Sequence, residues 1–336
     1  MTEHNFILAG DVGGTKTNLA VYSAGSDLGH PLFSATYASG DYGDFGTMIA
    51  EFLADSKFNV QRAAFGVAGP VLDGRAKITK LPWIIDRYLL EQDFGLSQVI
   101  VVNDLVATAY GLPALGQDDF VSLNSGIRRD KAPRVIIAPG TGLGESFMLW
   151  ENGRYRPYSS EGGHTPFAPA DELQDRLLAY LRPKYSTISN DLVGSGRGIP
   201  LLYEFLRDIG YAKELEAVAR KIASRSDQTP AIVQAAMSPQ ASPLCVATLD
   251  LFVSILASES ANLALKIMAT GGIFLGGGMP PRILPFLKNK FMTAFIGQDT
   301  LRELLADMPV QVIMEPRTAL LGAARLFDAT PACLPS

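Results

Sequence analysis

The chain has 336 residues, long enough to form two lobes, and its 47% hydrophobic and 19% charged residues are typical of a folded globular protein. The formal net charge of −5 argues against a surface that binds nucleic acid. The two cysteines, Cys245 and Cys333, offer neither a disulfide framework nor metal-ligand spacing, which is consistent with a reducing cytosol.

Targeting and membrane signals are not apparent in the sequence. Residues 1–5 lack the basic residues and the apolar core of a signal peptide. The most apolar later region, 251–281, contains Glu259, Lys266 and several glycines, so it predicts a core helix followed by a strand and a loop. We therefore expect a cytoplasmic protein that has no membrane partner.

Strands and helices alternate in the first hundred residues. Runs of branched and aromatic residues predict strands at 6–10, 18–22, 33–37, 62–67 and 98–102. Apolar residues at helical spacing predict a helix through 45–53, and Asp86 is placed to cap a helix that begins at Arg87. This order predicts a mixed sheet with helical cover.

A second set of strands is predicted from about 120 to 157, and helices dominate the rest of the chain. The predicted helices are 171–181, 199–209, 213–223, 244–268 and 318–327, with a strand at 310–314. We place the domain boundary near residue 108. The prediction is a small α/β lobe of 1–108, to which the final segment 318–336 returns, and a large α/β lobe of 109–317.

Two turns rich in glycine and threonine are the most informative feature. They are Asp11-Val12-Gly13-Gly14-Thr15-Lys16-Thr17 and Gly140-Thr141-Gly142-Leu143-Gly144. Each follows an apolar run and precedes a second strand-like run, so each predicts a β-hairpin whose turn exposes backbone N–H groups. A pair of such turns can hold a chain of phosphates from two sides, and it suggests that one architecture occurs twice.

Either turn alone could be an ordinary tight turn. Asp11 favours the phosphate interpretation of the first, because a carboxylate at the end of an apolar strand needs a partner and a hydrated Mg²⁺ is a suitable one. The second turn has GxGxG spacing and precedes a strand, so it lacks the strand–turn–helix context of a dinucleotide fingerprint. A GxxxxGK[ST] phosphate loop does not occur.

Three further segments carry polar or small residues where a ligand could bind. Asn103-Asp104 follows a wholly apolar strand, and Asp104 either caps the next helix or serves as a general base for a hydroxyl nucleophile. Glu161-Gly162-Gly163-His164 is either a surface loop or a sugar-binding loop. The strand within 271–278 is flanked by glycines, which serve close packing or let a flat ring lie against the backbone.

Taken in order, these segments resemble the bacterial glucokinase family, within the sugar kinase/Hsp70/actin superfamily. Residues 11–22 resemble the first phosphate motif of that superfamily, 138–148 the second and 271–284 the adenosine motif, while Asn103-Asp104 resembles the segment with the catalytic aspartate. The cysteine-rich zinc motif of the related ROK kinases and repressors is absent after His164, which favours the glucokinase branch.

The resemblance implies a two-lobed ribonuclease H-like fold of the actin/hexokinase type, with mixed sheets flanked by helices and a ligand cleft between the lobes. It implies ATP-dependent phosphorylation of glucose at the 6-hydroxyl, with Mg²⁺, in a homodimer. Asp104 would be the catalytic base, and Asp11 would order the metal through water. The sugar ligands would be Asn103, Asp104, Glu161, His164 and Asp191, and the nucleotide would be bound by Gly10, Asp11, Gly13, Gly14, Thr15, Lys16, Gly140, Thr141, Gly142, Gly276 and Gly277.

Two positions depart from the family pattern. The family usually has Thr-Asn near Thr79-Lys80, and it has a glutamate where this chain offers Asp191, just before the turn Ser195-Gly196-Arg197-Gly198. Both changes leave the reaction class intact, but they leave mannose, fructose and glucosamine open beside glucose. Because ADP and polyphosphate would meet the same hairpins, the phosphoryl donor also stays open.

Two functions from other classes compete with a sugar kinase. A sugar-responsive regulator without catalysis is disfavoured by the intact Asp11 and Asp104 and by the lack of a DNA-binding segment before Phe6. An ATPase like actin or Hsp70 usually has a longer chain and hydrolyses nucleotide without sugar. Release of ADP with and without hexose discriminates between these functions.

Overall fold

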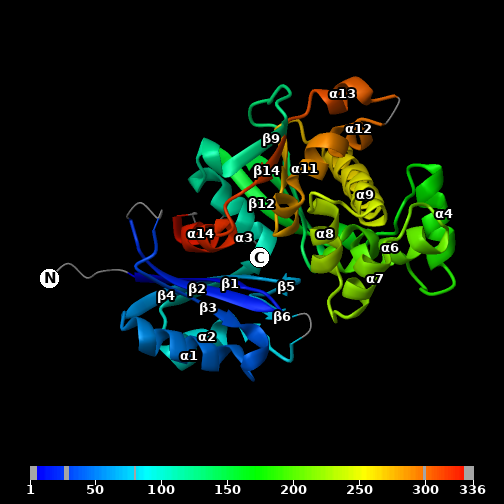
Figure 1. The fold of residues 1–336 in the computed structure, drawn as a ribbon. Helices are drawn as coiled ribbons and strands as arrows, with labels where there is room; N and C mark the ends of the chain where they lie inside the picture. Colours follow the sequence, from blue (N-terminus) through cyan, green and yellow to red (C-terminus); the bar gives the residue numbers. More distant parts are fainter. Residues whose placement is uncertain (1–5, 26–29, 79–80, 298–299, 329–336) are drawn as a thin grey trace. The chain divides into compact units, whose positions relative to one another are not determined.

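The computed structural model describes residues 6–25, 30–78, 81–297 and 300–328. The chain divides into two compact units (Figure 1). The first unit comprises 1–119, 153–159 and 315–336, and the second comprises 120–152 and 160–314.

The first unit is built on a five-stranded mixed sheet with the order β3-β2-β1-β4-β8. β1 and β2 form an antiparallel hairpin, β3 extends it, and β4 and β8 run parallel to β1. The three parallel strands are almost wholly buried, as expected of strands covered on both faces. The strands are β1 (Phe6–Val12), β2 (Lys16–Ser23), β3 (Phe33–Ala38), β4 (Val60–Val67) and β8 (Gln98–Asn103).

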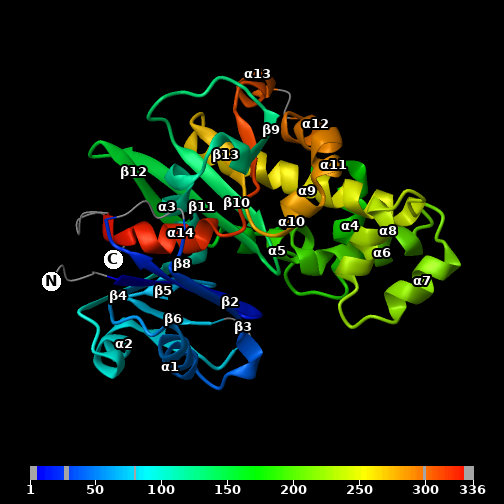
Figure 2. The same cartoon turned by 60° about the vertical axis from the view of Figure 1, so that its left-hand side comes forward.

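Two pairs of helices cover the two faces of this sheet (Figure 2). Successive residues of β1 point to opposite faces, so Leu8 packs with α1 and α2 while Ala9 packs with α3 and α14. Small residues on the second face let α3 and α14 approach closely. The helices are α1 (Phe45–Ser56), α2 (Arg87–Phe94), α3 (Asp104–Gly111) and α14 (Thr318–Arg325).

Local signals explain where these helices begin. Asp44 accepts a hydrogen bond from the Thr47 amide at 2.8 Å at the start of α1. Asp86 accepts one from the Tyr88 amide at 3.0 Å, which confirms the cap predicted for α2. A small antiparallel sheet that the sequence did not predict precedes α2; its strands are β5 (Val71–Leu72), β6 (Arg75–Lys77) and β7 (Ile84–Asp86).

The second unit repeats the arrangement of the first. Its own strands have the order β11-β10-β13-β14-β9, in which β10 and β11 form an antiparallel hairpin and β13 and β14 run parallel to β10. The order β11-β10-β13-β14 is that of β2-β1-β4-β8 in the first sheet, which confirms that one architecture occurs twice. These strands are β9 (Phe120–Asn124), β10 (Arg134–Pro139), β11 (Leu143–Glu151), β13 (Gly272–Leu275) and β14 (Val310–Ile313), whereas β12 (Arg154–Ser160) belongs to the first unit except for Ser160.

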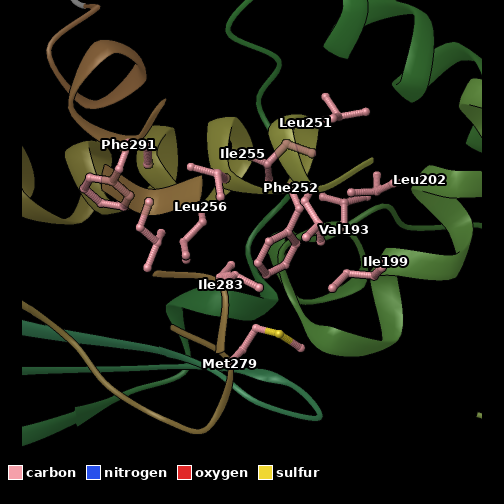
Figure 3. Packing of buried hydrophobic residues seen from close by; sticks show 14 of the residues in the cluster. Val193, Ile199, Leu202, Leu251, Phe252, Ile255, Leu256, Met279, Ile283 and Phe291 are labelled. Atoms are coloured by element: carbon pink, nitrogen blue, oxygen red, sulfur yellow. The ribbon is translucent and has the colours of Figure 1, made fainter. Parts of the chain in front are cut away.

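Helices make up most of the remaining second unit. They are α4 (Glu172–Leu181), α5 (Asn190–Gly194), α6 (Ile199–Asp208), α7 (Glu216–Ala223), α8 (Thr229–Met237), α9 (Pro243–Ile267), α10 (Met279–Arg282), α11 (Leu284–Phe286), α12 (Met292–Phe295) and α13 (Arg302–Ala306). Figure 3 shows Phe252 and Ile255 of α9 beside Val193 and Ile199, with Met279 next to them. The core around α9 thus fixes the segments that carry α5 and α10.

Helix α9 is the core helix that the sequence predicted. Within the described residues it is the one helix long and apolar enough to cross a membrane, but 78% of its most apolar window is buried inside the protein. Cys245 lies in this helix and is buried, whereas Cys333 lies outside the described residues.

Candidate active site

The first glycine-rich turn joins β1 to β2 and is held from one side by Ser39. The Ser39 hydroxyl donates to the Gly13 carbonyl at 2.7 Å, and the Ser39 amide donates to the Thr15 carbonyl at 3.0 Å. The Gly13 amide closes the turn by donating to the Lys16 carbonyl at 3.1 Å. Thr15 and Lys16 are exposed, so the outer part of a fixed turn is open to a ligand.

Asp11 lies at the end of β1, opposite Asn18 of β2. The Asn18 amide group donates to Oδ2 of Asp11 at 3.1 Å. Burial raises the pKa of Asp11, and the bond from Asn18 and the charge of Lys16 oppose this shift only in part. Preceding Gly10 has a packing role in this place, because a Cβ there would lie 2.6 Å from the Phe65 ring.

Asp104 lies at the same edge of the first sheet as Asp11. The parallel register pairs Val12 with Val67 and Val67 with Asn103, so the carboxyl ends of β1, β4 and β8 coincide. In open α/β sheets this edge is where ligands bind. The structure thus brings the predicted metal-ordering carboxylate and the predicted base to one edge of one sheet.

Asn103, rather than Asp104, is the N-cap of α3. Its Oδ1 accepts from the Leu105 amide at 2.9 Å, and its Nδ2 donates to the Gly69 carbonyl at 3.2 Å. Oδ1 of Asp104 also accepts from the Leu105 amide, at 2.9 Å. The helix start therefore fixes the direction of both side chains.

The second glycine-rich turn joins β10 to β11 in the second unit. The Gly140 amide donates to the Gly142 carbonyl at 2.8 Å, and the Gly196 amide donates to the Gly140 carbonyl at 2.8 Å. Thr141 at its tip is exposed. The turn is braced from its inner side and open on its outer side, as in the first unit.

The glycines that follow β13 lie at the same edge of the second sheet as this turn. The Gly276 amide donates to the Ile137 carbonyl at 2.9 Å, next to the end of β10. Gly277 has a left-handed backbone, with φ of 77°, and a Cβ there would lie 3.1 Å from the Pro139 carbonyl. Only glycine tolerates this conformation at so close an approach.

The Glu161–His164 loop packs onto the strand that leaves the second turn. A Cβ on Gly163 would overlap the Leu143 carbonyl oxygen, so the loop lies directly against the first residue of β11. Nε2 of His164 lies 3.8 Å from Oε2 of Glu161, with side chains 64% and 52% exposed. Both side chains are therefore accessible to a ligand.

Asp191 is buried at the start of α5. Its Oδ1 accepts from the Leu143 amide at 2.7 Å, and its Oδ2 pairs with Nη2 of Arg197 at 3.0 Å. The backbone N–H of the neighbouring Asn190 donates to the Thr165 carbonyl at 3.1 Å. In the second unit, α5 is thus connected to both the second glycine-rich turn and the Glu161–His164 loop.

Comparison with known proteins identifies the family to which this arrangement belongs. The sequence profile of the glucokinase family matches residues 8–330. The chain is 36% identical to a glucokinase of Trichormus variabilis over 335 residues, which cover 95% of this chain and 97% of that protein. The chain belongs to the glucokinase family. The prediction of a glucokinase from the sequence is confirmed.

Solved structures agree with this family. A glucokinase from an Antarctic psychrotroph superposes with a TM-score of 0.78 and 28% identity, and the match covers 97% of this chain and all of that chain. A ROK family glucokinase from Streptomyces griseus, solved with glucose and AMPPNP, has the same fold at a TM-score of 0.66 and 21% identity, over 96% of this chain and 99% of that one. The predicted fold class is confirmed.

The described side chains limit how many protein ligands a metal ion could have in this chain. Within the described ranges, three or more His, Cys, Asp or Glu side chains do not gather into a group that could hold a metal ion. A single buried carboxylate such as Asp11 fits a Mg²⁺ that keeps most of its water and takes its other ligands from phosphates. Asp11 is therefore compatible with the indirect role that the resemblance implies.

Sequence reasoning missed three residues that shape the site. Ser39 braces the first turn, Arg197 contacts the second, and Glu145 lies against the Glu161–His164 loop, where a Cβ on Gly162 would overlap its Oε2. Arg197 could have been noticed as the cation inside the Ser-Gly-Arg-Gly turn. Thr79 and Lys80, one of the two departures from the family pattern, lie outside the described residues.

Proposed function

We propose that this chain transfers the γ-phosphoryl group of ATP to the 6-hydroxyl of glucose, with Asp104 as the general base. The observation that supports this most strongly is the shared sheet edge of Asp11 and Asp104 in a chain of the glucokinase family. A phosphoryl transfer needs a metal-bound phosphate chain and a base for the hydroxyl nucleophile. These two carboxylates are suited to those two tasks.

In the proposed reaction, the carboxylate of Asp104 accepts the proton of the 6-hydroxyl as that oxygen attacks the γ-phosphorus. The bond from the γ-phosphorus to the bridging oxygen breaks, and ADP leaves. Most of the catalysis comes from positioning and charge stabilisation, as in other phosphoryl transfers. When bound, Mg²⁺ would neutralise charge on the phosphates, and Asp11 would hold one of its waters.

The sugar would be bound by Asn103, Glu161 and His164 in addition to Asp104. Carboxylate, amide and imidazole groups suit a ligand that presents many hydroxyls. The exposure of Glu161 and His164 and their 3.8 Å separation support this role. Asp191, which the resemblance places among the sugar ligands, is bound to the Leu143 amide and to Arg197 in this structure.

The nucleotide would be bound by backbone groups of the two turns and by the glycines after β13. The first turn supplies Gly10, Asp11, Gly13, Gly14, Thr15 and Lys16, the second supplies Gly140, Thr141 and Gly142, and the glycines after β13 are Gly276 and Gly277. Fixed inner contacts and exposed outer residues support this assignment for Thr15 and Thr141. The complex of a structural neighbour with AMPPNP supports ATP as the donor.

The homodimer and the preference for glucose over mannose, fructose or glucosamine rest on the family resemblance, while the cytoplasmic location rests on the sequence composition and its two unpaired cysteine contexts. The lobe boundary near residue 108 likewise stays a prediction. A sugar-responsive regulator without activity is the second candidate function.

The test is release of ADP from ATP with each of these hexoses and without sugar, in the presence of Mg²⁺. We expect release to depend strongly on glucose. Equal release without sugar would select an ATPase, and no release with any hexose would select the regulator. Replacement of ATP by ADP or polyphosphate as donor, with formation of glucose 6-phosphate as the readout, decides the donor.

A further inference from the structure

Asp191 and Arg197 enclose the tip of the second phosphate-type turn with three hydrogen bonds. Oδ1 of Asp191 accepts from the Leu143 amide at 2.7 Å, and Nε of Arg197 donates to the Thr141 carbonyl at 2.7 Å. Nη2 of Arg197 joins Oδ2 of Asp191 at 3.0 Å and closes the ring. We call this pair of side chains the turn clamp.

The clamp fits the turn too closely to be an incidental ion pair. Gly142 lies between the two clamped residues, and a Cβ there would lie 2.6 Å from Oδ1 of Asp191. The Asp191 side chain is 12% exposed, whereas that of Arg197 is 55% exposed. Asp191 therefore supports the turn from its buried side, while the guanidinium of Arg197 reaches the solvent beside Thr141.

Both members of the clamp are carried by segments that are themselves fixed. Ser189 caps α5 through the Leu192 amide at 3.2 Å, and Val193 of α5 packs in the core around α9 (Figure 3). Beside Arg197, the Gly196 carbonyl accepts from the Thr229 hydroxyl at 2.8 Å. A rigid support of this kind keeps backbone N–H groups in place for an anion, which removes part of the ordering penalty of binding.

The charges of the clamp also suit a turn that binds phosphate. A lone buried carboxylate under the turn would repel a triphosphate, but the guanidinium beside it compensates this charge. The planar guanidinium reaches the carboxylate and the Thr141 carbonyl at the same time through different nitrogens. A lysine has a single ammonium and cannot reproduce this fork.

We propose that Asp191 and Arg197 are positioning residues that hold the Thr141–Leu143 turn for the phosphates of ATP, and that Asp191 is not a sugar ligand. This inference rests on the proposed function, since it takes the turn to be the phosphate site. Both oxygens of Asp191 accept a hydrogen bond from the protein and its side chain is only 12% exposed, so we assign the sugar to Asn103, Asp104, Glu161 and His164.

The test compares the nucleotide and sugar parameters of Asp191→Asn, Arg197→Gln and Arg197→Lys. Asp191→Asn keeps an acceptor for the Leu143 amide and removes the charge that holds Arg197. We expect KM for ATP to rise at least about tenfold in Asp191→Asn and Arg197→Gln, with KM for glucose within about twofold of wild type. Arg197→Lys keeps the positive charge but not the fork, so its KM for ATP should lie between those of wild type and Arg197→Gln.

A matched control is Arg207→Gln, which removes an arginine from the surface pair with Asp208, at 2.8 Å in the same unit. It should leave both KM values unchanged. A rise in KM for glucose with unchanged KM for ATP in Asp191→Asn would overturn the proposal and restore the sugar-ligand role. If Asp191→Asn and Arg197→Gln lower the melting temperature but leave both KM values unchanged, the proposal is also overturned, because the clamp would then contribute to stability and not to ATP binding.

Direct binding of ATP, measured by calorimetry without sugar, separates this inference from the proposed function. If wild type binds ATP but does not phosphorylate any hexose, the proposed function fails, while weaker ATP binding by Asp191→Asn still supports the clamp. If wild type phosphorylates glucose and both clamp variants bind ATP as tightly as wild type, the clamp proposal fails alone.

Discussion

The carboxyl groups of Glu145 on β11 and Glu259 on α9 are close enough in the core of the second unit for each to shift the pKa of the other. The two residues are only 2% and 3% exposed, and in the described part of the chain Oε1 of each is buried without a hydrogen-bond partner. Burial, reinforced by the charge of Glu259, raises the pKa of Glu145 to about 8. With a pKa of about 8, Glu145 is mostly protonated at neutral pH.

The groups around this pair do not fully offset its burial. Lys266 favours the charged form of both carboxyls, and Nδ2 of Asn262 donates to Oε2 of Glu259 at 3.1 Å. Even so, burial raises the pKa of Glu259 as well. Because Gly162 lies directly against Glu145, the pair also supports the Glu161–His164 loop.

This pair makes the stability of the protein depend on pH. In the unfolded chain Glu145 loses its proton near pH 4.5, but in the folded protein it does so near pH 8. Between these values the folded state binds more protons, so its stability falls as the pH rises, by up to about 1.4 kcal/mol per pH unit for one proton. Below pH 4.5 the contribution is fully present, and above pH 8 it is lost.

We predict that Glu145→Gln removes this dependence, because its uncharged amide group imitates the protonated carboxyl and does not titrate. The difference in melting temperature between variant and wild type should grow in favour of the variant from pH 5 to pH 8. Glu172→Gln, at an exposed position of α4, is the matched control and should show no such trend. A constant difference between Glu145→Gln and wild type across this range would show that Glu145 is not protonated in the folded protein.

The structure supports a sharp prediction for the proposed base. Asp104→Asn keeps the size of the side chain and an acceptor for the Leu105 amide, but an amide cannot take the proton of the sugar hydroxyl. We expect turnover to fall by roughly 10²–10⁴ while KM for glucose changes little. Asp93→Asn, at an exposed position of α2, should keep full turnover. Turnover near that of wild type in Asp104→Asn would remove Asp104 from its role.

A different kinetic response is expected at Glu161. This side chain is half exposed and lies beside His164, so its proposed contribution is sugar binding rather than proton transfer. Glu161→Ala should weaken glucose binding by roughly 1–3 kcal/mol, the usual loss for a hydrogen bond to a charged group. The measurement is KM for glucose and for ATP side by side. An unchanged KM for glucose would show that Glu161 is not a ligand.

Local signals in the sequence were sufficient for most of the fold. Asp86 could be recognised as a cap because its partner, the Tyr88 amide, is two residues away. The sheet of β5, β6 and β7 could not be recognised, because strands of two or three residues are too short to show an alternating pattern. Helix α5 is also short and contains a glycine, and its position depends on the core around α9.

In the candidate site, too, residues in contiguous motifs could be predicted, whereas contacts between distant parts of the chain could not. Asp11, Asp104 and the glycines could be found because each belongs to a contiguous motif. The contact of Arg197 with Thr141 joins residues that are 56 positions apart, and no pattern in one sequence connects them. The sequence could therefore indicate candidate ligand-binding residues, but not which residues hold those candidates in place.

The close contact of α3 with α14 in the first unit gives a stability prediction. A Cβ on Gly322 would overlap the Ala107 carbonyl oxygen and lie 2.6 Å from the Gly111 amide nitrogen. In an exposed helix, glycine to alanine stabilises by roughly 0.5–1 kcal/mol. At Gly322 we expect the opposite, a loss of roughly 1–3 kcal/mol, because the two helix backbones must separate.

Thermal and urea unfolding of Gly322→Ala measure this effect, and Gly43→Ala is the control because the space around that glycine is open. The control should lie within roughly 0.5 kcal/mol of wild type, as surface substitutions usually do. Since α3 begins at Asp104, separation of the helices should also lower turnover in Gly322→Ala at temperatures where it is still folded. An alanine variant as stable and as active as wild type would show that α14 does not hold the helix that begins at Asp104 in place.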